Sequence, residues 1–228
     1  MKRLLKILFL YIPVGYIAVS VLLVLLFKWA PVKFTPLMLE RSLDGTATLS
    51  CVRTNRWTAL DEISPALQRS VVASEDARFF EHKGFDFVEL KTMKEKHEKL
   101  GKKIRGCSTL SQQTAKNCFT SGSRTLLRKA VEAYYTFLIE KIWGKKRILE
   151  VYLNVAELGP GIYGAEAASK KYYGKNAAKL SYGESAALVL CLPNPLKRTP
   201  DWVNRHMSTR RMEIERISMQ TKLLFDRK

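Results

Sequence analysis

The chain has 228 residues, of which 46% are apolar and 26% are charged, a balance that fits a globular domain and excludes intrinsic disorder. Its formal net charge of +18 calls for an anionic partner, such as acidic lipid headgroups, a phosphorylated substrate or nucleic acid, unless the basic residues only form a solvated surface. The four cysteines are widely spaced and do not cluster with histidine at metal-ligand spacing, so we interpret them as small buried apolar residues rather than disulfides.

The first predicted element is an apolar segment that follows a basic N-terminus. Three basic residues precede the uncharged run from Ile7 to Phe27, whose 21 residues are enough for a helix to cross a hydrocarbon core about 30 Å thick. The run exceeds the roughly 7–15 apolar residues of a signal peptide, and no small-residue cleavage site follows it. We therefore predict a cytoplasmic N-terminus at residues 1–6, a transmembrane anchor at 7–28 and a functional domain on the outer side.

Residues 29–58 contain Pro31, Pro36 and Gly45 among short polar clusters, which is typical of a connector, and Thr46–Val52 has the composition of a short strand. From residue 59 to residue 228 the pattern is mostly helical and predicts one domain. The helices expected there are one from Pro65 with Ser64 as N-cap, a polar basic one from Phe87, one over 124–143 closed by Gly144, one over 146–158, one over 182–192 stopped by Pro193, and a basic one over 208–225.

Two polar segments of this domain could carry chemistry. SEDARFFEHKG places Glu75 and Asp76 at the end of an apolar helix, where low-dielectric surroundings raise the proton affinity of a carboxylate and allow it to act as a base. GCSTLSQQTAKN, at 106–117, offers hydroxyls, amides and Lys116 to sugar hydroxyls and phosphate oxygens. The ordinary alternatives are a capped turn with local ion pairs and a polar loop that begins a helix.

A third segment places Arg124, Arg128 and Glu132 at positions i, i+4 and i+8, on one helix face. Two guanidinium groups and an acid could hold a phosphate there, although an exposed salt-bridge ladder has the same pattern. Together with the anchor, the three segments favour a membrane-borne substrate that contains sugar and pyrophosphate.

These segments resemble the signatures of the peptidoglycan glycosyltransferases of glycosyltransferase family 51, and in particular of the monofunctional biosynthetic peptidoglycan transglycosylases. The matching stretches occur in order and are EDARFFEHKG (75–84), GCSTLSQQTAKN (106–117), RKAVE (128–132), ILEVYLN (148–154), GIYGAEAASKKYYG (161–174) and ESAALVLCLPN (184–194).

The resemblance implies roles for individual residues. Glu75 would be the catalytic base, and Glu132 a second essential acid beside the pyrophosphate of the donor and any bound metal ion. The cations that would bind the pyrophosphate are Lys116, Arg124, Arg128 and Lys129. The residues that would shape the cleft and bind substrate are Asp76, Phe79, Ser108, Gln112, Gln113 and Asn117.

The family fold is a mainly α-helical, lysozyme-like domain with a cleft between two lobes. The implied reaction polymerises lipid II into β-1,4-linked glycan strands with inversion and releases undecaprenyl diphosphate. No tightly bound cofactor is implied, although Mg²⁺ or Mn²⁺ can assist such a reaction. The sequence has neither S-x-x-K nor K-T-G, so we expect no transpeptidase activity.

The expected location is the bacterial inner membrane, with a single span and a periplasmic catalytic domain that serves cell-wall biogenesis and cell shape. The expected partners are lipid II, the growing glycan chain, membrane lipids and proteins of cell division or elongation, but not nucleic acid. Two rival interpretations are a lytic transglycosylase or muramidase, which has little need of a cationic donor site, and an anchored basic binding module, whose basic residues would lie on an open face.

Overall fold

The structure is a computed structural model that describes residues 11–45, 56–101, 108–123 and 125–226. Two sequence predictions, the strand at Thr46–Val52 and the role of Arg124, lie outside the described residues. The predicted mainly helical character is confirmed, because helices carry most of the described chain and its sheet holds only two short strands.

The α-helices are α2 (Ile12–Trp29), α3 (Pro36–Leu43), α5 (Pro65–Glu75), α6 (Phe87–Leu100), α7 (Leu110–Phe119), α8 (Leu126–Ile142), α9 (Gly144–Val155), α10 (Ala165–Tyr173), α11 (Tyr182–Val189), α12 (Pro200–His206) and α13 (Ser208–Gln220). The described residues also form the 3-10 turns η2 (Leu60–Glu62), η3 (Ala177–Lys179) and η4 (Leu224–Asp226) and the antiparallel strands β1 (Glu157–Gly159) and β2 (Ile162–Tyr163).

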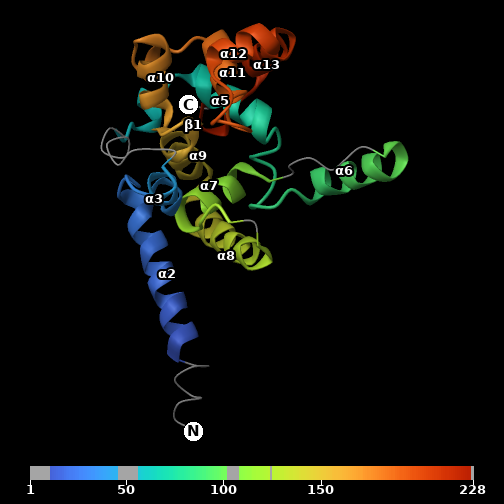
Figure 1. Cartoon of the computed structure of the whole chain (residues 1–228). Coiled ribbons are helices and arrows are strands. Elements are labelled where there is room, and N and C mark those ends of the chain that lie inside the picture. The colour runs from blue at the N-terminus through green and yellow to red at the C-terminus, as the bar shows by residue number, and fades with distance from the viewer. Residues whose placement is uncertain (1–10, 46–55, 102–107, 124, 227–228) are drawn as a thin grey trace.

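Two groups of helices pack around a shared core. In one group α7 packs against α8 and α9, and in the other α5 packs against α11 and α13 (Figure 1). The core joins the groups, because Leu67 and Val71 of α5 belong to the same buried cluster as Ile139 of α8 and Leu149 of α9. A smaller apolar cluster fills the space between α11, α12 and α13.

The helix that leads to the predicted base begins as the sequence predicts. Pro65 occupies the first turn of α5, and the side chain of Ser64 accepts a hydrogen bond from the backbone of Ala66. The apolar residues of α5 are buried, so the helix is fixed against the core and its last residue, Glu75, has a defined position.

Some helix ends differ from the sequence prediction. Gly144 takes a positive φ of 75° and separates α8 from α9, which starts at this glycine rather than two residues later. The prediction that residues 157 and 158 continue that helix is wrong, because they form β1, which pairs with β2. Strands of three and two residues are too short to give an alternating pattern that a sequence analysis can detect.

The apolar helix α2 extends away from the body of the molecule (Figure 1). It is long and apolar enough to cross a membrane, with a mean hydropathy of 2.0, which is consistent with the predicted anchor. Its second half packs against α8: Val24 is fully buried, and the hydroxyl groups of Ser20 and Tyr134 share a hydrogen bond of 2.6 Å. Arg147 of α9 also donates to backbone oxygens at the end of α2.

The polar helix predicted from Phe87 is present as α6 and projects from the side of the molecule (Figure 1). The Asp86 side chain caps its start by accepting from the backbone of Glu89. Phe87, Val88 and Leu90 are exposed on it.

Candidate active site

Three adjoining hollows meet around Glu75 and Ser108. The largest is a cavity of about 630 Å³ lined by residues of α3, α7, α8 and α9 and by the segment after α11. A second, of about 490 Å³, is lined by Glu75 and shares Ser108 and Lys116 with the first. A third, of about 240 Å³, is lined by Glu75, Asp76, Asp86 and Met93. Glu75 therefore lines two of these adjoining hollows.

The carboxylate of Glu75 is half-buried and held by one side chain. Gln113 of α7 donates from Nε2 to Oε2 of Glu75 at 3.0 Å. Burial raises the pKa of Glu75 above its usual value, the hydrogen bond from Gln113 opposes this, and the charge of Asp76 adds to it. A carboxylate with a raised pKa is a better general base near neutral pH.

The amide of Gln113 is itself oriented by two contacts. Its Nε2 lies 3.3 Å from the backbone oxygen of Ser108, and its Oε1 accepts a hydrogen bond of 3.0 Å from the hydroxyl group of Tyr152 on α9. Tyr152 is only 1% exposed. The sequence analysis did not assign a function to Tyr152, although the residue lies within the ILEVYLN stretch.

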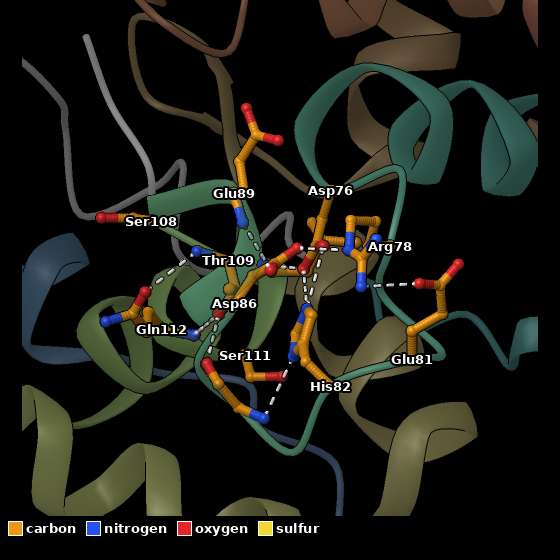
Figure 2. Close-up of polar contacts among 12 residues, drawn as sticks. Asp76, Arg78, Glu81, His82, Asp86, Glu89, Ser108, Thr109, Ser111 and Gln112 are labelled. Atoms are coloured by element: carbon orange, nitrogen blue, oxygen red, sulfur yellow. Dashed lines mark hydrogen bonds and ion pairs between the residues drawn. The ribbon is translucent and has the colours of Figure 1, made fainter. Parts of the chain in front are cut away.

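The neighbouring Asp76 lines the third hollow, and its carboxylate connects the end of α5 to α7. Its carboxylate lies 3.0 Å from Nε2 of His82 and accepts a hydrogen bond of 2.9 Å from the backbone of Leu110, at the start of α7 (Figure 2). Because Nδ1 of His82 accepts from the backbone of Gly84 at 3.1 Å, the ring proton lies on Nε2 and is donated to Asp76. The stretch EDARFFEHKG thus supplies one acid, Glu75, that Gln113 holds beside the hollows, and a second, Asp76, that positions the start of α7.

Asp76, His82 and Asp86 have side-chain atoms within 4.8 Å of one another and resemble a metal cluster. Two observations argue against a metal ion there. Nε2 of His82 carries the proton, and Nε of Arg78 forms an ion pair of 3.1 Å with Asp86 (Figure 2). We interpret the cluster as a hydrogen-bonded connection that fixes the loop between α5 and α6.

The large cavity has a cationic side centred on Glu132. This carboxylate is 2% exposed; its Oε2 forms an ion pair of 2.5 Å with Arg128, and its Oε1 contacts Nζ of Lys129. Burial and the nearby charge of Arg128 lower the pKa of Lys116, which lines the same cavity. Lys116, Arg128 and Lys129 line the same cavity, and several cations on one wall favour the binding of an anion.

A divalent metal ion at Glu132 does not fit this arrangement. Both oxygens of the carboxylate contact cations, and those cations would have to move before a metal ion could bind. The metal-binding role of Glu132 therefore stays a prediction that these contacts do not support.

The helix α3 contributes residues to the cavity that the sequence analysis missed. Leu37, Glu40 and Arg41 line the cavity, and Nε of Arg41 lies 3.3 Å from Oε2 of the buried Glu157. This part of the chain was interpreted as a connector because of its prolines. The signal for a helix was present in the pair Thr35-Pro36, since the Thr35 side chain caps α3 and proline fits its first turn.

Most of the other predicted site residues line the hollows, and one does not. Ser108 and Gln113 lie where the hollows adjoin. Gln112 lines the second hollow, and its side chain accepts a hydrogen bond from the backbone of Thr109 in a capping box. Asn117 lines the large cavity. Phe79 is fully buried beneath the ammonium of Lys145, 4.4 Å from the ring centre, and lines none of the described hollows, so its effect on the cleft is indirect.

Comparisons with known proteins agree with the six sequence stretches. The family model described as Transglycosylase matches residues 44–220. The chain is 50% identical over 196 residues to a biosynthetic peptidoglycan transglycosylase of Caulobacter vibrioides, covering 86% of this chain and 83% of the relative. It is 50% identical over 181 residues to the protein of that name from Shewanella oneidensis, with 79% and 77% covered, and 44% identical over 204 residues to that of Bacteroides thetaiotaomicron, with 89% and 82% covered.

Proposed function

This chain belongs to the Transglycosylase family and is a peptidoglycan glycosyltransferase with a lysozyme-like helical fold, and from that premise we propose that it polymerises lipid II into β-1,4-linked glycan strands and releases undecaprenyl diphosphate. The observation that carries the proposal is the position of Glu75. Among the described residues, it lines both a hollow whose one basic lining residue is Arg78 and a hollow that adjoins the cavity whose wall carries Lys116, Arg128 and Lys129.

We assign the acceptor to the smaller hollow and the donor to the large cavity. Glu75 takes the proton of the acceptor's 4-hydroxyl group, whose oxygen attacks C1 of the donor sugar. The bond between C1 and the diphosphate oxygen breaks, and its electron pair leaves with the diphosphate. This displacement inverts the configuration at C1. The cationic wall is placed to stabilise the charge that grows on this leaving group.

We derive no step through a metal ion, and a role for Mg²⁺ or Mn²⁺ stays a prediction. The proposal also keeps the single span of α2, with a cytoplasmic N-terminus and a periplasmic domain, because both the enzyme and a polyprenyl-linked substrate would then share one membrane face. Polymerisation without cross-linking, and contacts with division or elongation proteins, are further parts of the proposal.

The test is to incubate the full chain in detergent with labelled lipid II. Long glycan is the expected product. Shortening of preformed strands would support the lytic alternative, and absence of any turnover would support a binding module.

Glu75→Gln should lower the turnover rate by about 10²–10⁴-fold, because the amide keeps the shape of the carboxylate but cannot accept the proton. Glu81→Gln is the matched control, since Glu81 is an exposed acid of the same segment that pairs only with Arg78 among the described contacts. Near-normal synthesis by folded Glu75→Gln would remove Glu75 from the role of base.

A further inference from the structure

A buried tyrosine supports the hydrogen bond that holds the base. Tyr152 lies on α9, a different helix from the one that ends at Glu75, and its hydroxyl group lies 3.0 Å from Oε1 of Gln113. An amide oxygen can only accept a hydrogen bond, so the tyrosine hydroxyl is the donor. The amide nitrogen of Gln113 then points to Glu75 at 3.0 Å, and the three side chains form a chain of hydrogen bonds with one direction.

The direction matters because a glutamine amide can rotate by half a turn. The rotated amide would place its oxygen against the Glu75 carboxylate and near the Ser108 carbonyl oxygen, 3.3 Å from the present nitrogen position, so acceptors would face acceptors. A tyrosine hydroxyl group can also accept a hydrogen bond, so the two acceptors, the Glu75 carboxylate and the Ser108 carbonyl oxygen, select the orientation of the amide. The Tyr152 hydroxyl group stabilises that orientation by donating to Oε1.

The hydroxyl keeps this role throughout the working pH range. Burial raises the pKa of Tyr152 well above its usual value, and the nearby charge of Glu75 raises it further. The side chain therefore stays protonated and remains a donor. At 1% exposure its ring is fixed by the core, so the hydroxyl has little freedom to move away from Gln113.

We propose that Tyr152 is a positioning residue, and this proposal rests on the proposed role of Glu75 as base. By donating to Gln113, Tyr152 fixes the amide so that its nitrogen binds Oε2 of Glu75. Oε1 of Glu75 is then left to take the proton of the acceptor hydroxyl group. The competing explanation is that Tyr152 only fills the core. A third is that its hydroxyl contacts the donor directly, since Tyr152 also lines the large cavity.

Tyr152→Phe separates these explanations because it keeps the ring and removes only the hydroxyl. We expect kcat for lipid II to fall about 5- to 30-fold with an almost unchanged KM, the size of effect given by losing one positioning hydrogen bond. The acid limb of the pH–rate profile should move to higher pH, because the hydrogen bond from Gln113 that lowers the pKa of Glu75 is weakened. A residue that only fills the core would change neither the ratio of kcat to KM nor the pH profile.

The matched control is Tyr173→Phe. The Tyr173 hydroxyl lies 3.3 Å from the backbone oxygen of Glu184, and Tyr173 lines none of the described hollows, so its loss should leave kcat and the pH profile unchanged.

A double-mutant cycle tests whether Tyr152 acts through Gln113. In the Gln113→Ala background, Tyr152→Phe should have no further effect on kcat, because the amide on which it acts is gone. A full effect in that background, or a raised KM, would assign Tyr152 to the donor instead and overturn the proposal, as would wild-type kinetics of Tyr152→Phe. Wild-type kinetics combined with inactive Glu75→Gln would reject only the positioning role, whereas active Glu75→Gln would reject the base itself.

Discussion

The indole nitrogen of Trp143 donates a hydrogen bond of 2.7 Å to the backbone oxygen of Val24, and so joins the end of α8 to the middle of the apolar helix α2. Trp143 is 7% exposed and Val24 is fully buried. The second half of α2 is therefore part of the packed structure of the catalytic domain. The predicted boundary between anchor and connector lies after residue 28, so the residues of α2 that make these contacts belong to the predicted anchor.

Two truncations should behave differently for this reason. Deleting residues 1–28 removes Val24 and Ser20 and leaves Trp143 and Tyr134 without their partners, so we expect a folded protein with a lower melting temperature in the same detergent. Each lost kcal/mol corresponds to about 2–4 °C in a chain of this size. Deleting residues 1–15 is the control and should leave the melting temperature unchanged. Equal melting temperatures for the two would show that α2 is only a tether.

The raised pKa of Glu75 predicts opposite effects on activity and stability. Activity should fall as the pH drops through the pKa of the folded state, which lies above 4.5, because the base becomes protonated. The folded state also binds this proton more tightly than the unfolded state, so ionised Glu75 destabilises the fold once the pH exceeds that pKa. Inactive Glu75→Gln should consequently melt at the same or a higher temperature than the wild type at pH 7.5, with the difference disappearing below about pH 4. A Glu75→Gln protein that is less stable at pH 7.5 would contradict this prediction.

Asp76→Asn should lower stability, although Asp76 lies next to the base. The Asp76 carboxylate accepts from both His82 and the backbone of Leu110, and an asparagine would turn a donor toward one of these donors. Such a mismatch costs about 1–3 kcal/mol. Thermal unfolding measures it, with Asp61→Asn on the exposed turn η2 as the control. Unchanged melting would mean that Asp76 does not hold α7 in place.

The limits of the sequence analysis follow from the kind of contact involved. The cap of α5 at Ser64 is local and could be predicted from neighbouring residues, whereas the role of Glu75 as base stays a prediction from its motif. The contact between Arg41 and Glu157 joins residues 116 positions apart, and neither residue carries a pattern that identifies the other. The same is true of Tyr152 and Gln113, whose hydroxyl and amide meet only because α7 and α9 pack together.

The last prediction concerns Arg128, whose buried Nε has no hydrogen-bond partner among the described residues, while one of its terminal nitrogens binds Glu132. Because this nitrogen is buried, a diphosphate oxygen would satisfy it only after the Arg128 side chain turns toward the cavity. The planar guanidinium group can bind two oxygens at once, which lysine cannot do. Arg128→Lys should therefore lower turnover although the charge is kept, and Arg128→Ala should lower it further, mainly in kcat, if charge on the leaving diphosphate grows toward the transition state. Arg210→Ala is the control, because Arg210 pairs with Glu213 at 2.6 Å on the exposed face of α13, where such a pair contributes about 0.2–1 kcal/mol. If Arg128→Ala turned over lipid II at the wild-type rate and lost only as much stability as Arg210→Ala, the pair of Arg128 and Glu132 would be structural, and other cations would have to hold the diphosphate.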